Sequence, residues 1–274
     1  MPKIIAICNQ KGGVGKTSTA VSLSAGLALE NKKTLLIDLD PQANATSGVG
    51  INKSEVDRTI YHALLGESTI NEIVRETCVK NLYVVPSSSN LAGAEVELVS
   101  EFGREGKLKK ALSAVDSSYH YVIIDCPPSF GLLTINALTS AHTLIVPIQC
   151  EYYALEGLGQ LMKTINLVRD NLNPDLKVEG ILMTMADFRT KLAQEVIEEV
   201  RKHFGTQVYK TIIPRNIKLS EAPGFGKPIF VYDKHSEGAI KYKEFVNEFI
   251  IFNAMLSNAT TSDVNNQNVN QQVS

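Results

Sequence analysis

The chain has 274 residues, of which 44% are hydrophobic, and its formal net charge is −2. This length allows one large domain or two small ones, with enough apolar residues for a sizeable core. The near-neutral balance excludes a protein that is basic throughout, so any contact with nucleic acid has to come from a local patch.

Apolar runs that predict strands alternate along the chain with stretches that predict helices. The expected strands are Lys3–Cys8, Thr34–Asp38, Leu82–Pro86, Tyr121–Asp125, Thr143–Ile148, Val178–Met185 and Val208–Ile213. The expected helices are Lys16–Glu30, Lys107–Val115, Leu132–Ser140, Leu155–Leu172, Leu192–Phe204 and Glu237–Met255, with shorter ones between Glu55 and Glu76. This order is typical of an α/β fold with a doubly wound, mostly parallel sheet and helices on both faces.

We expect one domain over residues 1–256 and a disordered tail, rich in Asn, Gln, Ser and Thr, over residues 257–274. The last expected helix carries Tyr242, Phe245, Val246, Phe249 and Phe252 at helical spacing, which predicts a face packed on the sheet. The first strand begins almost at the N-terminus, and no apolar run approaches the roughly 20 residues that span a bilayer. We therefore expect a soluble cytoplasmic protein.

The cysteines give a further indication of the compartment. Cys8, Cys78, Cys126 and Cys150 are scattered without a C-x-x-C pair, and three of them lie in or beside apolar runs. Buried free thiols in a reducing cytosol fit this pattern better than a disulfide framework or a structural zinc site.

A glycine-rich stretch joins the first expected strand to the first expected helix: Lys11-Gly12-Gly13-Val14-Gly15-Lys16-Thr17-Ser18. Glycines let successive N–H groups turn toward an anion, and the helix start adds its partial positive charge. In a phosphate-binding loop, Lys16 would reach the β- and γ-phosphates and the Thr17 hydroxyl would bind Mg²⁺. Gln10 stands where the standard loop has its first glycine, and a second lysine, Lys11, follows it. A glycine-rich turn with incidental lysines is the alternative.

Acidic residues end two of the expected strands. Asp38 and Asp40 lie at the end of the second strand, on the side of an open α/β sheet where ligands bind. Both are suited to holding Mg²⁺-bound water or to orienting an attacking water, although solvation of a turn would give the same pattern. Asp125 follows the buried run Tyr121–Ile124, as the acid of a Walker B strand does, and we expect it to hold Mg²⁺ through water. Pro127 and Pro128 end that strand and begin a loop that could sense the γ-phosphate.

Several other motifs accompany these, and all of them stand in a definite order along the chain. The others are the runs Asp38–Gly48, Ile123–Ser129, Gln149–Gly157, Ile213–Asn216 and Leu219–Pro223. Together they resemble the chromosomal ParA (Soj) branch of the ParA/MinD ATPases, which are P-loop NTPases with a deviant Walker A loop. The resemblance implies an ATP-bound sandwich homodimer that binds double-stranded DNA without sequence preference. It also implies a ParB-type centromere-binding partner that stimulates ATP hydrolysis and release, and a nucleoid-associated location.

The resemblance assigns roles to individual positions. Lys11 is similar to the lysine that reaches the ATP of the partner subunit, Lys16 to the P-loop lysine, and Asp40 to the residue that positions the hydrolytic water. Thr17 and Asp125 match the residues that hold Mg²⁺. The residues implied to bind the nucleotide are Lys11, Gly12, Gly13, Val14, Gly15, Lys16, Thr17, Ser18, Pro214 and Asn216, the last two at the adenine.

Positive charge is concentrated in one part of the chain. Residues 186–243 carry eleven Lys and Arg against seven Asp and Glu, a balance of +4, whereas the rest of the chain carries sixteen against twenty-two, a balance of −6. This distribution favours a local DNA-binding surface. Arg189 and Lys218 fall where the Soj branch has DNA-contacting arginines, and Lys191 and Lys202 are weaker candidates. Taken singly, each is equally well explained as a solvated surface charge.

Related functions on the same fold remain as alternatives. A MinD-like membrane-cycling ATPase needs a basic amphipathic helix at the C-terminus, and the last residues lack any cation. An iron–sulfur ATPase needs cysteines placed to bind a cluster, and Cys126 has no suggestively spaced partner. A metabolic ligase or synthetase, or a relative that positions another cargo, would share the same loop.

Overall fold

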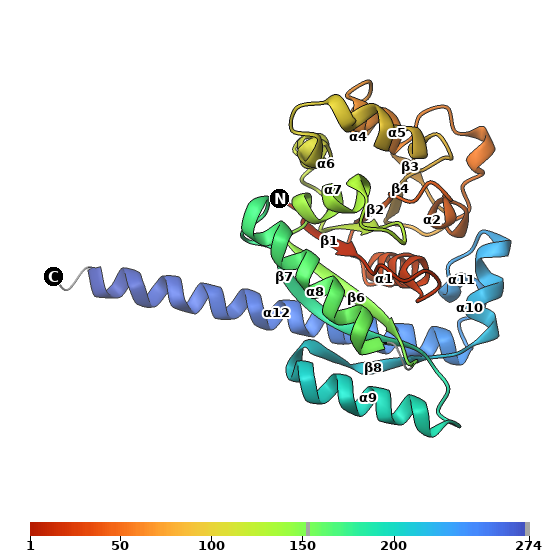
Figure 1. The fold of residues 1–274 in the computed structure, drawn as a ribbon, viewed down its shortest axis with the longest axis vertical. Helices are drawn as coiled ribbons and strands as arrows, with labels where there is room; N and C mark the ends of the chain where they lie inside the picture. The colour runs from red at the N-terminus through yellow and green to blue at the C-terminus, as the bar shows by residue number, and fades with distance from the viewer. Residues whose placement is uncertain (152–153, 272–274) are drawn as a thin grey trace.

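The computed structural model describes the backbone of residues 1–151 and 154–271, and the side chains of residue 156 and of residues 256–271 lie outside the described set. Its centre is one eight-stranded sheet with the order β3-β4-β2-β5-β1-β6-β7-β8 (Figure 1). The strands are β1 Lys3–Ile7, β2 Thr34–Asp38, β3 Arg75–Glu76, β4 Leu82–Val85, β5 Tyr121–Asp125, β6 Thr143–Gln149, β7 Lys177–Ala186 and β8 Val208–Pro214. All seven predicted strands are present and parallel, which confirms the predicted fold class.

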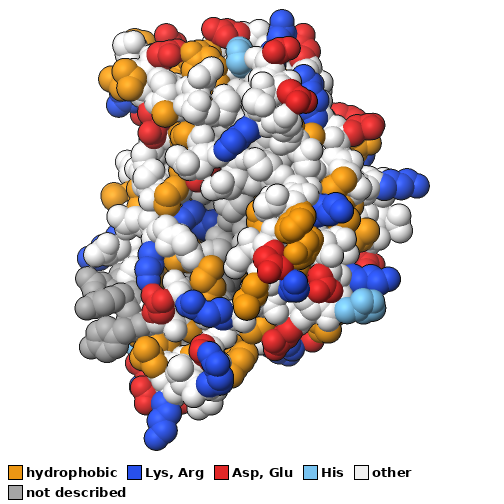
Figure 2. All heavy atoms as spheres, turned by 90° about the vertical axis from the view of Figure 1, so that its right-hand side faces the viewer, with side chains coloured by type: hydrophobic (Ala, Val, Ile, Leu, Met, Phe, Trp, Pro, Cys, Tyr) orange, Lys and Arg blue, Asp and Glu red, His pale blue; other side chains and the backbone are white. Residues whose placement is uncertain are grey.

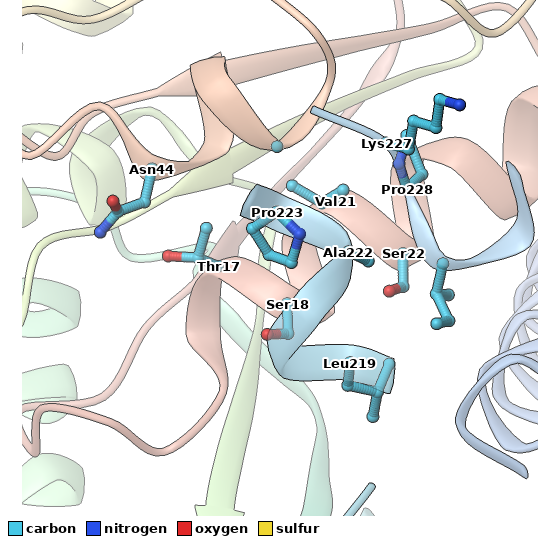
Figure 3. Close-up of a pocket in the computed structure, with 12 residues that line it drawn as sticks. Thr17, Ser18, Val21, Ser22, Asn44, Leu219, Ala222, Pro223, Lys227 and Pro228 are labelled. Carbon is cyan, nitrogen blue, oxygen red and sulfur yellow. The ribbon is translucent and has the colours of Figure 1, made fainter. Parts of the chain in front are cut away.

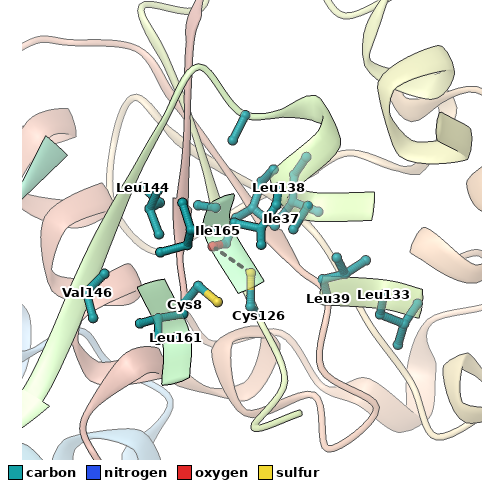
Figure 4. Packing of buried hydrophobic residues seen from close by; sticks show 14 of the residues in the cluster. Cys8, Ile37, Leu39, Cys126, Leu133, Leu138, Leu144, Val146, Leu161 and Ile165 are labelled. Atoms are coloured by element: carbon teal, nitrogen blue, oxygen red, sulfur yellow. Dashed lines mark hydrogen bonds between the residues drawn. The ribbon is translucent and has the colours of Figure 1, made fainter. Parts of the chain in front are cut away.

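Alternate side chains of the strands enter two separate cores, one on each face of the sheet. Ile5 and Ile7 of β1 belong to one core, whereas Ala6 and the following Cys8 belong to the other. This alternation follows from the two-residue period of a strand, and burial on both faces explains why the strands are apolar throughout. Figure 4 shows the second core around Cys8 and Cys126.

Helices cover both faces of the sheet. The helices are α1 Lys16–Leu29, α2 Asn44–Gly48, α3 Ile60–Leu65, α4 Ile70–Ile73, α5 Leu91–Glu97, α6 Lys107–Leu112, α7 Leu132–Ser140, α8 Ala154–Asn171, α9 Lys191–Phe204, α10 Ile217–Glu221, α11 Ile229–Tyr232 and α12 Glu237–Gln271. Side chains of α1, α2, α11 and α12 form one core, and those of α3 to α9 form the other. The short elements α2, β3, α5, α10 and α11 were not predicted, because none is long enough to show a clear period.

Helix α12 packs against α1 and β8 through its first half. Tyr242, Phe245, Val246 and Phe249 are buried, as predicted, but Phe252 is 38% exposed and lies at the edge of the packed face. The backbone of α12 continues as helix to Gln271, through residues for which we expected disorder. Residues 272–274 of that expected tail lie outside the described residues.

Two other expectations concern the cysteines and the membrane. The structure contains four free thiols, of which Cys8, Cys126 and Cys150 are buried and Cys78 is exposed. Within the described part of the chain, the helices are too short or too polar to cross a bilayer.

The order of the strands places a crevice at the carboxyl end of β1. From β1 the chain turns to one side to form β2, β4 and β5, and it then crosses to the other side to form β6, β7 and β8. Ligands of open α/β sheets bind at such a reversal point, outside the carboxyl ends of the strands. The glycine-rich loop, Asp40, Asp125 and Pro214 all follow or end strands at this edge.

Candidate nucleotide-binding site

The glycine-rich loop leaves β1 and enters α1 through two left-handed residues. Gly13 has φ +73° and Gly15 has φ +85°, a region that costs other residues energy. On one side the loop is fixed by Thr184, whose hydroxyl donates to the carbonyl of Val14 at 2.9 Å. On the other it is fixed by the buried Asn9, which donates to the Pro147 carbonyl and accepts the Lys11 N–H at 3.0 Å. Asn9 and Thr184 were not predicted as part of the site, because neither belongs to a motif.

The side chain of Lys16, the first residue of α1, lies inside the glycine-rich loop. Its ammonium donates to the carbonyl oxygen of Lys11 at 2.9 Å, and the residue is only 6% exposed. Burial lowers the pKa of the Lys16 ammonium, and the nearby carboxylate of Asp125 acts in the opposite direction. The loop, Lys16 and Asp125 are therefore brought together as predicted.

Asp125 is a fully buried carboxyl group whose two oxygens make no hydrogen bond with the described residues. Burial raises the pKa of Asp125 well above its ordinary value, with repulsion from Asp38 adding to it, while Thr17 and Lys16 lower it. A buried acid without hydrogen-bond partners is costly, so a cation at this point would stabilise it. Carboxylate and hydroxyl oxygens are ligands that Mg²⁺ accepts, and Asp125 with Thr17 therefore fits the predicted magnesium site.

The structure gives Asp38 and Asp40, two neighbouring acids at the end of β2, different hydrogen-bond partners. One carboxylate oxygen of Asp38 accepts the N–H and the hydroxyl of Thr46, each at 2.7 Å, and the other accepts the N–H of Asp40 at 3.2 Å. Asp38 thus holds the loop before α2, and its burial raises its pKa to about 6. Of these hydrogen bonds, the carboxylate of Asp40 accepts just one, from the N–H of Gln42 at 2.9 Å. The carboxylate of Asp40 therefore stays available to a ligand.

Lys11 points away from Lys16 and is held by its own chain. Its ammonium lies 2.7 Å from a carboxylate oxygen of Glu151, and both side chains are about half exposed, at 51% and 45%. The other carboxylate oxygen of Glu151 accepts a hydrogen bond from Gln149 at the end of β6. Glu151 belongs to the motif run Gln149–Gly157, but its contact with Lys11 is not visible in the sequence. Tyr152 and Tyr153 of that run lie outside the described residues.

Pro214 and Asn216 line a cavity of about 220 Å³ together with Gly15 and Ser18. Asn216 is the N-cap of α10, where its side-chain oxygen accepts the N–H of Lys218 at 3.0 Å. A second, narrow cavity of about 30 Å³ lies between α1 and α10. Figure 3 shows Thr17 and Ser18 of α1 on one side of it and Pro223 on the other. The predicted adenine residues are therefore adjacent to the loop, although they are about 200 positions away in sequence.

The predicted DNA-contacting residues follow neighbouring strands. Arg189 comes after β7 and Lys218 after β8, and the two strand ends are joined where Arg215 donates its N–H to Ala186 at 3.0 Å. Arg189 is 88% exposed and forms two hydrogen bonds to Asp187, at 2.8 and 2.7 Å. Lys218 pairs with Glu221 at 2.8 Å. Each cation is thus partly neutralised by a neighbouring acid. The charge balance of residues 186–243 does not show this pairing.

Figure 2 shows the face that carries α10 and α11, which is hollowed near its middle. Lys and Arg side chains surround this hollow and continue below it, among acidic and hydrophobic ones. The surface is therefore mixed in charge rather than uniformly basic.

Comparison with known proteins agrees with this geometry. A family model described as an AAA domain matches residues 2–178. The sporulation initiation inhibitor protein Soj of Bacillus subtilis is 56% identical over 248 residues, which cover 90% of this chain and 98% of that protein. The chromosome partitioning protein ParA of Myxococcus xanthus is 55% identical over 240 residues, covering 88% and 85%.

A solved structure of cobyrinic acid a,c-diamide synthase from Mycobacterium smegmatis, with a bound ATP analog and magnesium, is also similar. It superposes with a TM-score of 0.79 at 38% identity, covering 90% of this chain and 93% of that one. Identity to the Bacillus subtilis Soj and Myxococcus xanthus ParA proteins is clearly higher and extends over most of each chain. The chain therefore belongs to the Soj/ParA family of chromosome-partitioning ATPases.

Proposed function

We propose that this protein is a DNA-segregation ATPase whose MgATP-bound homodimer binds double-stranded DNA without sequence preference. A ParB-type partner stimulates hydrolysis of ATP to ADP and phosphate, after which the dimer separates and leaves the DNA. The proposal places the protein in the cytoplasm, on the nucleoid. The observation that carries it is the buried, unpaired Asp125 carboxylate beside Lys16 and Thr17 at the start of α1.

The residues around Asp125 account for binding of the triphosphate. The N–H groups of Gly12 to Gly15 and the Lys16 ammonium would bind the phosphate oxygens, for which the Lys16 ammonium would leave the Lys11 carbonyl. Thr17 and Asp125 would hold Mg²⁺, and the ion would neutralise negative charge on the β- and γ-phosphates. Pro214 and Asn216 would lie against the adenine in the cavity that they share with Gly15 and Ser18.

Asp40 is the candidate for orienting the attacking water. The residue is 7% exposed, and its carboxylate accepts the Gln42 N–H at 2.9 Å. Phosphoryl transfer depends on positioning and electrostatic stabilisation more than on covalent chemistry, so one fixed acceptor for the water is enough. Asp38 is occupied by Thr46 and serves to fix this loop.

Lys11 links the nucleotide to assembly. Its side chain is exposed and directed to Glu151 rather than to its own phosphate site, which leaves it able to reach a second subunit. If Lys11 of each subunit binds the γ-phosphate held by the other, ATP joins the two copies and hydrolysis separates them. Dimerisation would also double the phosphate contacts of Arg189 and Lys218, and affinity for DNA rises steeply with the number of such contacts.

The direct test measures oligomeric state and DNA binding with ADP, with ATP and with a non-hydrolysable ATP analogue. We expect the analogue to give a dimer that binds duplexes of unrelated sequence equally, and ADP to give a monomer that does not bind. A ParB-type protein should then increase ATP turnover in the presence of DNA. A chain that stays monomeric with the analogue and binds DNA equally with every nucleotide would contradict the proposal.

Two alternatives make different predictions. A MinD-like protein would bind vesicles of anionic lipid when ATP is present, through a basic amphipathic helix. A synthetase like the similar solved structure would consume ATP together with a second small substrate, without stimulation by DNA and partner. Vesicle sedimentation and the partner-stimulated ATPase assay distinguish the three functions.

A further inference from the structure

Apolar side chains are exposed on helix α5, on the turn of 3₁₀ helix that follows it, Leu98–Ser100, and just after that turn. Val96, Val99 and Phe102 are 74%, 59% and 102% exposed. The inner side of this segment is already complete, since Leu91, Ala94 and Leu98 are buried at helical spacing. The three exposed side chains are therefore not needed for the core, and together with Glu95, Glu97 and Glu101 they define what we call the α5 surface.

The α5 surface is acidic as well as apolar. Residues 95–107 contain four Glu against Arg104 and Lys107, a net charge of −2. The tyrosine hydroxyl of Tyr61 donates to Glu97 at 2.9 Å, and the ammonium of Lys107 lies 2.9 Å from Glu101. These contacts fix the two carboxylates on either side of Val99. A complementary partner would be basic and apolar, because it would bury Val96, Val99 and Phe102 while pairing the acids.

Glu95 connects this surface to the loop that follows Asp125. One of its carboxylate oxygens accepts the N–H of Leu133 at 3.4 Å, at the start of α7. The same oxygen is so close to Gly131 that a Cβ on that glycine would lie 2.2 Å from it. Residues 126–131 run directly from the magnesium-binding acid to α7, so a group that displaces Glu95 also moves the end of this loop.

We propose that the α5 surface is the docking site for a basic and apolar segment of the ParB-type partner, here called its basic segment, and that Glu95 transmits docking to the loop after Asp125. This inference rests on the proposed function, because it locates the partner of the same ATPase. A second copy of the chain is a poorer occupant, since a twofold contact of this surface with itself would bring Glu97 and Glu101 against like charges.

Docking is tested with full-length protein, MgATP, duplex DNA and a synthetic peptide that copies the basic segment of the ParB-type protein from the same genome. The variant combines Val96→Ser with Phe102→Ser. Its matched control combines Leu29→Ser with Ile251→Ser, two apolar residues that are 53% and 55% exposed elsewhere. We expect the Kd for the peptide to rise by about tenfold or more in the α5 variant alone, because these apolar side chains would be central to the contact. Basal hydrolysis and ATP-dependent DNA binding should be unchanged in both variants.

The outcome of this peptide experiment shows whether the proposed function or the docking site is wrong. A wild-type chain that the peptide neither binds nor stimulates contradicts the ParB part of the proposed function. Normal stimulation of wild type with equal stimulation of the α5 variant overturns the docking site only. Loss of ATP-dependent DNA binding in the α5 variant, with a normal control, would assign the surface to a second copy and also overturn the inference.

The positioning role of Glu95 has a separate readout. In Glu95→Ala we expect the peptide to bind with wild-type affinity while the stimulated kcat falls toward the basal rate. Glu95→Gln keeps an oxygen that accepts the Leu133 N–H and should restore most of the stimulation. Weaker peptide binding without a change in stimulated kcat at saturation would contradict transmission through Glu95.

Discussion

The ammonium of Lys11 and the carboxylate of Glu151, 140 residues apart in sequence, form an ion pair within one subunit with a separation of 2.7 Å. In the proposed dimer the same ammonium binds the γ-phosphate of the other subunit. The two contacts exclude each other, so Glu151 competes with assembly. Because both side chains are about half exposed, the pair contributes at most about 1 kcal/mol.

From this competition we predict that Glu151→Gln favours the ATP-bound dimer. Each dimer releases two such pairs, so the expected gain in the dimerisation constant is up to about thirtyfold, which is what about 2 kcal/mol allows. Analytical ultracentrifugation with a non-hydrolysable analogue measures it. Glu244→Gln, which removes a similarly exposed pair with Lys241 on α12, is the control. Weaker dimerisation of Glu151→Gln than of the control would show that Glu151 supports the dimer instead.

Lys16 and Asp40 should separate binding from hydrolysis. Lys16→Ala removes the ammonium at the centre of the loop and is expected to abolish ATP-dependent DNA binding. Asp40→Ala leaves the loop intact, so the dimer and its DNA complex should persist while turnover stops. Nucleotide binding, DNA retention and phosphate release are measured on the same preparations. Hydrolysis by Asp40→Ala at the wild-type rate would refute the water-positioning role.

The buried state of Asp125 predicts a pH dependence of magnesium affinity. Burial raises its pKa well above the ordinary value of 3.8, so at low pH the carboxyl is protonated and Mg²⁺ has to displace that proton. The apparent affinity for Mg²⁺ in the presence of ATP should therefore increase as the pH rises. Asp125→Asn carries no proton to displace and should lose this part of the dependence. Magnesium titrations of both proteins across pH provide the comparison, and parallel curves would contradict the assignment.

The acid beside Arg189 should limit affinity for DNA. The side chain of Arg189 hydrogen-bonds Asp187 and lowers its pKa to about 2, so Asp187 is charged at neutral pH and neutralises part of the arginine. We predict that Asp187→Asn strengthens DNA binding. Arg189→Ala with Lys218→Ala should weaken it equally for all sequences and reduce the salt slope by about one for each lost phosphate contact. Dimerisation serves as the control measurement and should be unchanged in all of these variants.

Contact between α1 and α12 gives a prediction about stability. A Cβ added to Gly26 would lie 2.5 Å from a methyl carbon of Val246, so Gly26→Ala overpacks the core at a cost of about 1–3 kcal/mol. This exceeds the gain of up to about 1 kcal/mol in helix propensity. Gly159→Ala on α8, where a Cβ meets nothing within 4 Å, should instead stabilise the chain by about 0.5–1 kcal/mol. Equilibrium urea unfolding measures both, and an equal change in the two variants would contradict the packing argument.

Local patterns predicted the elements that are long or chemically distinctive. Strands such as Tyr121–Asp125 are buried on both faces, so their apolar runs are unambiguous, and the glycine loop carries its own signature. Helix α5 was missed because its buried residues cover only two turns and its exposed side is also apolar.

The hydrogen bonds of individual side chains could not be predicted from the sequence. Nothing in the run that begins at Asp38 shows that its carboxylate binds Thr46 while Asp40 stays available. Likewise the pairing of Arg189 with Asp187 depends on the turn after β7, which residue counting does not describe. Motif spacing indicates which residues belong to a site. The hydrogen bonds of their side chains determine which of these residues are available to a ligand.

The hydrogen bond between Thr19 of α1 and Tyr242 of α12, at 3.1 Å, has a consequence for synthesis on the ribosome. The phosphate loop emerges well before α12, yet the helix that begins at Lys16 is covered by α12. A nascent chain therefore cannot complete its nucleotide site before translation has passed residue 249, the last fully buried aromatic of α12. If the proposed function is correct, an unfinished chain would therefore be unable to form the ATP-dependent dimer that binds DNA.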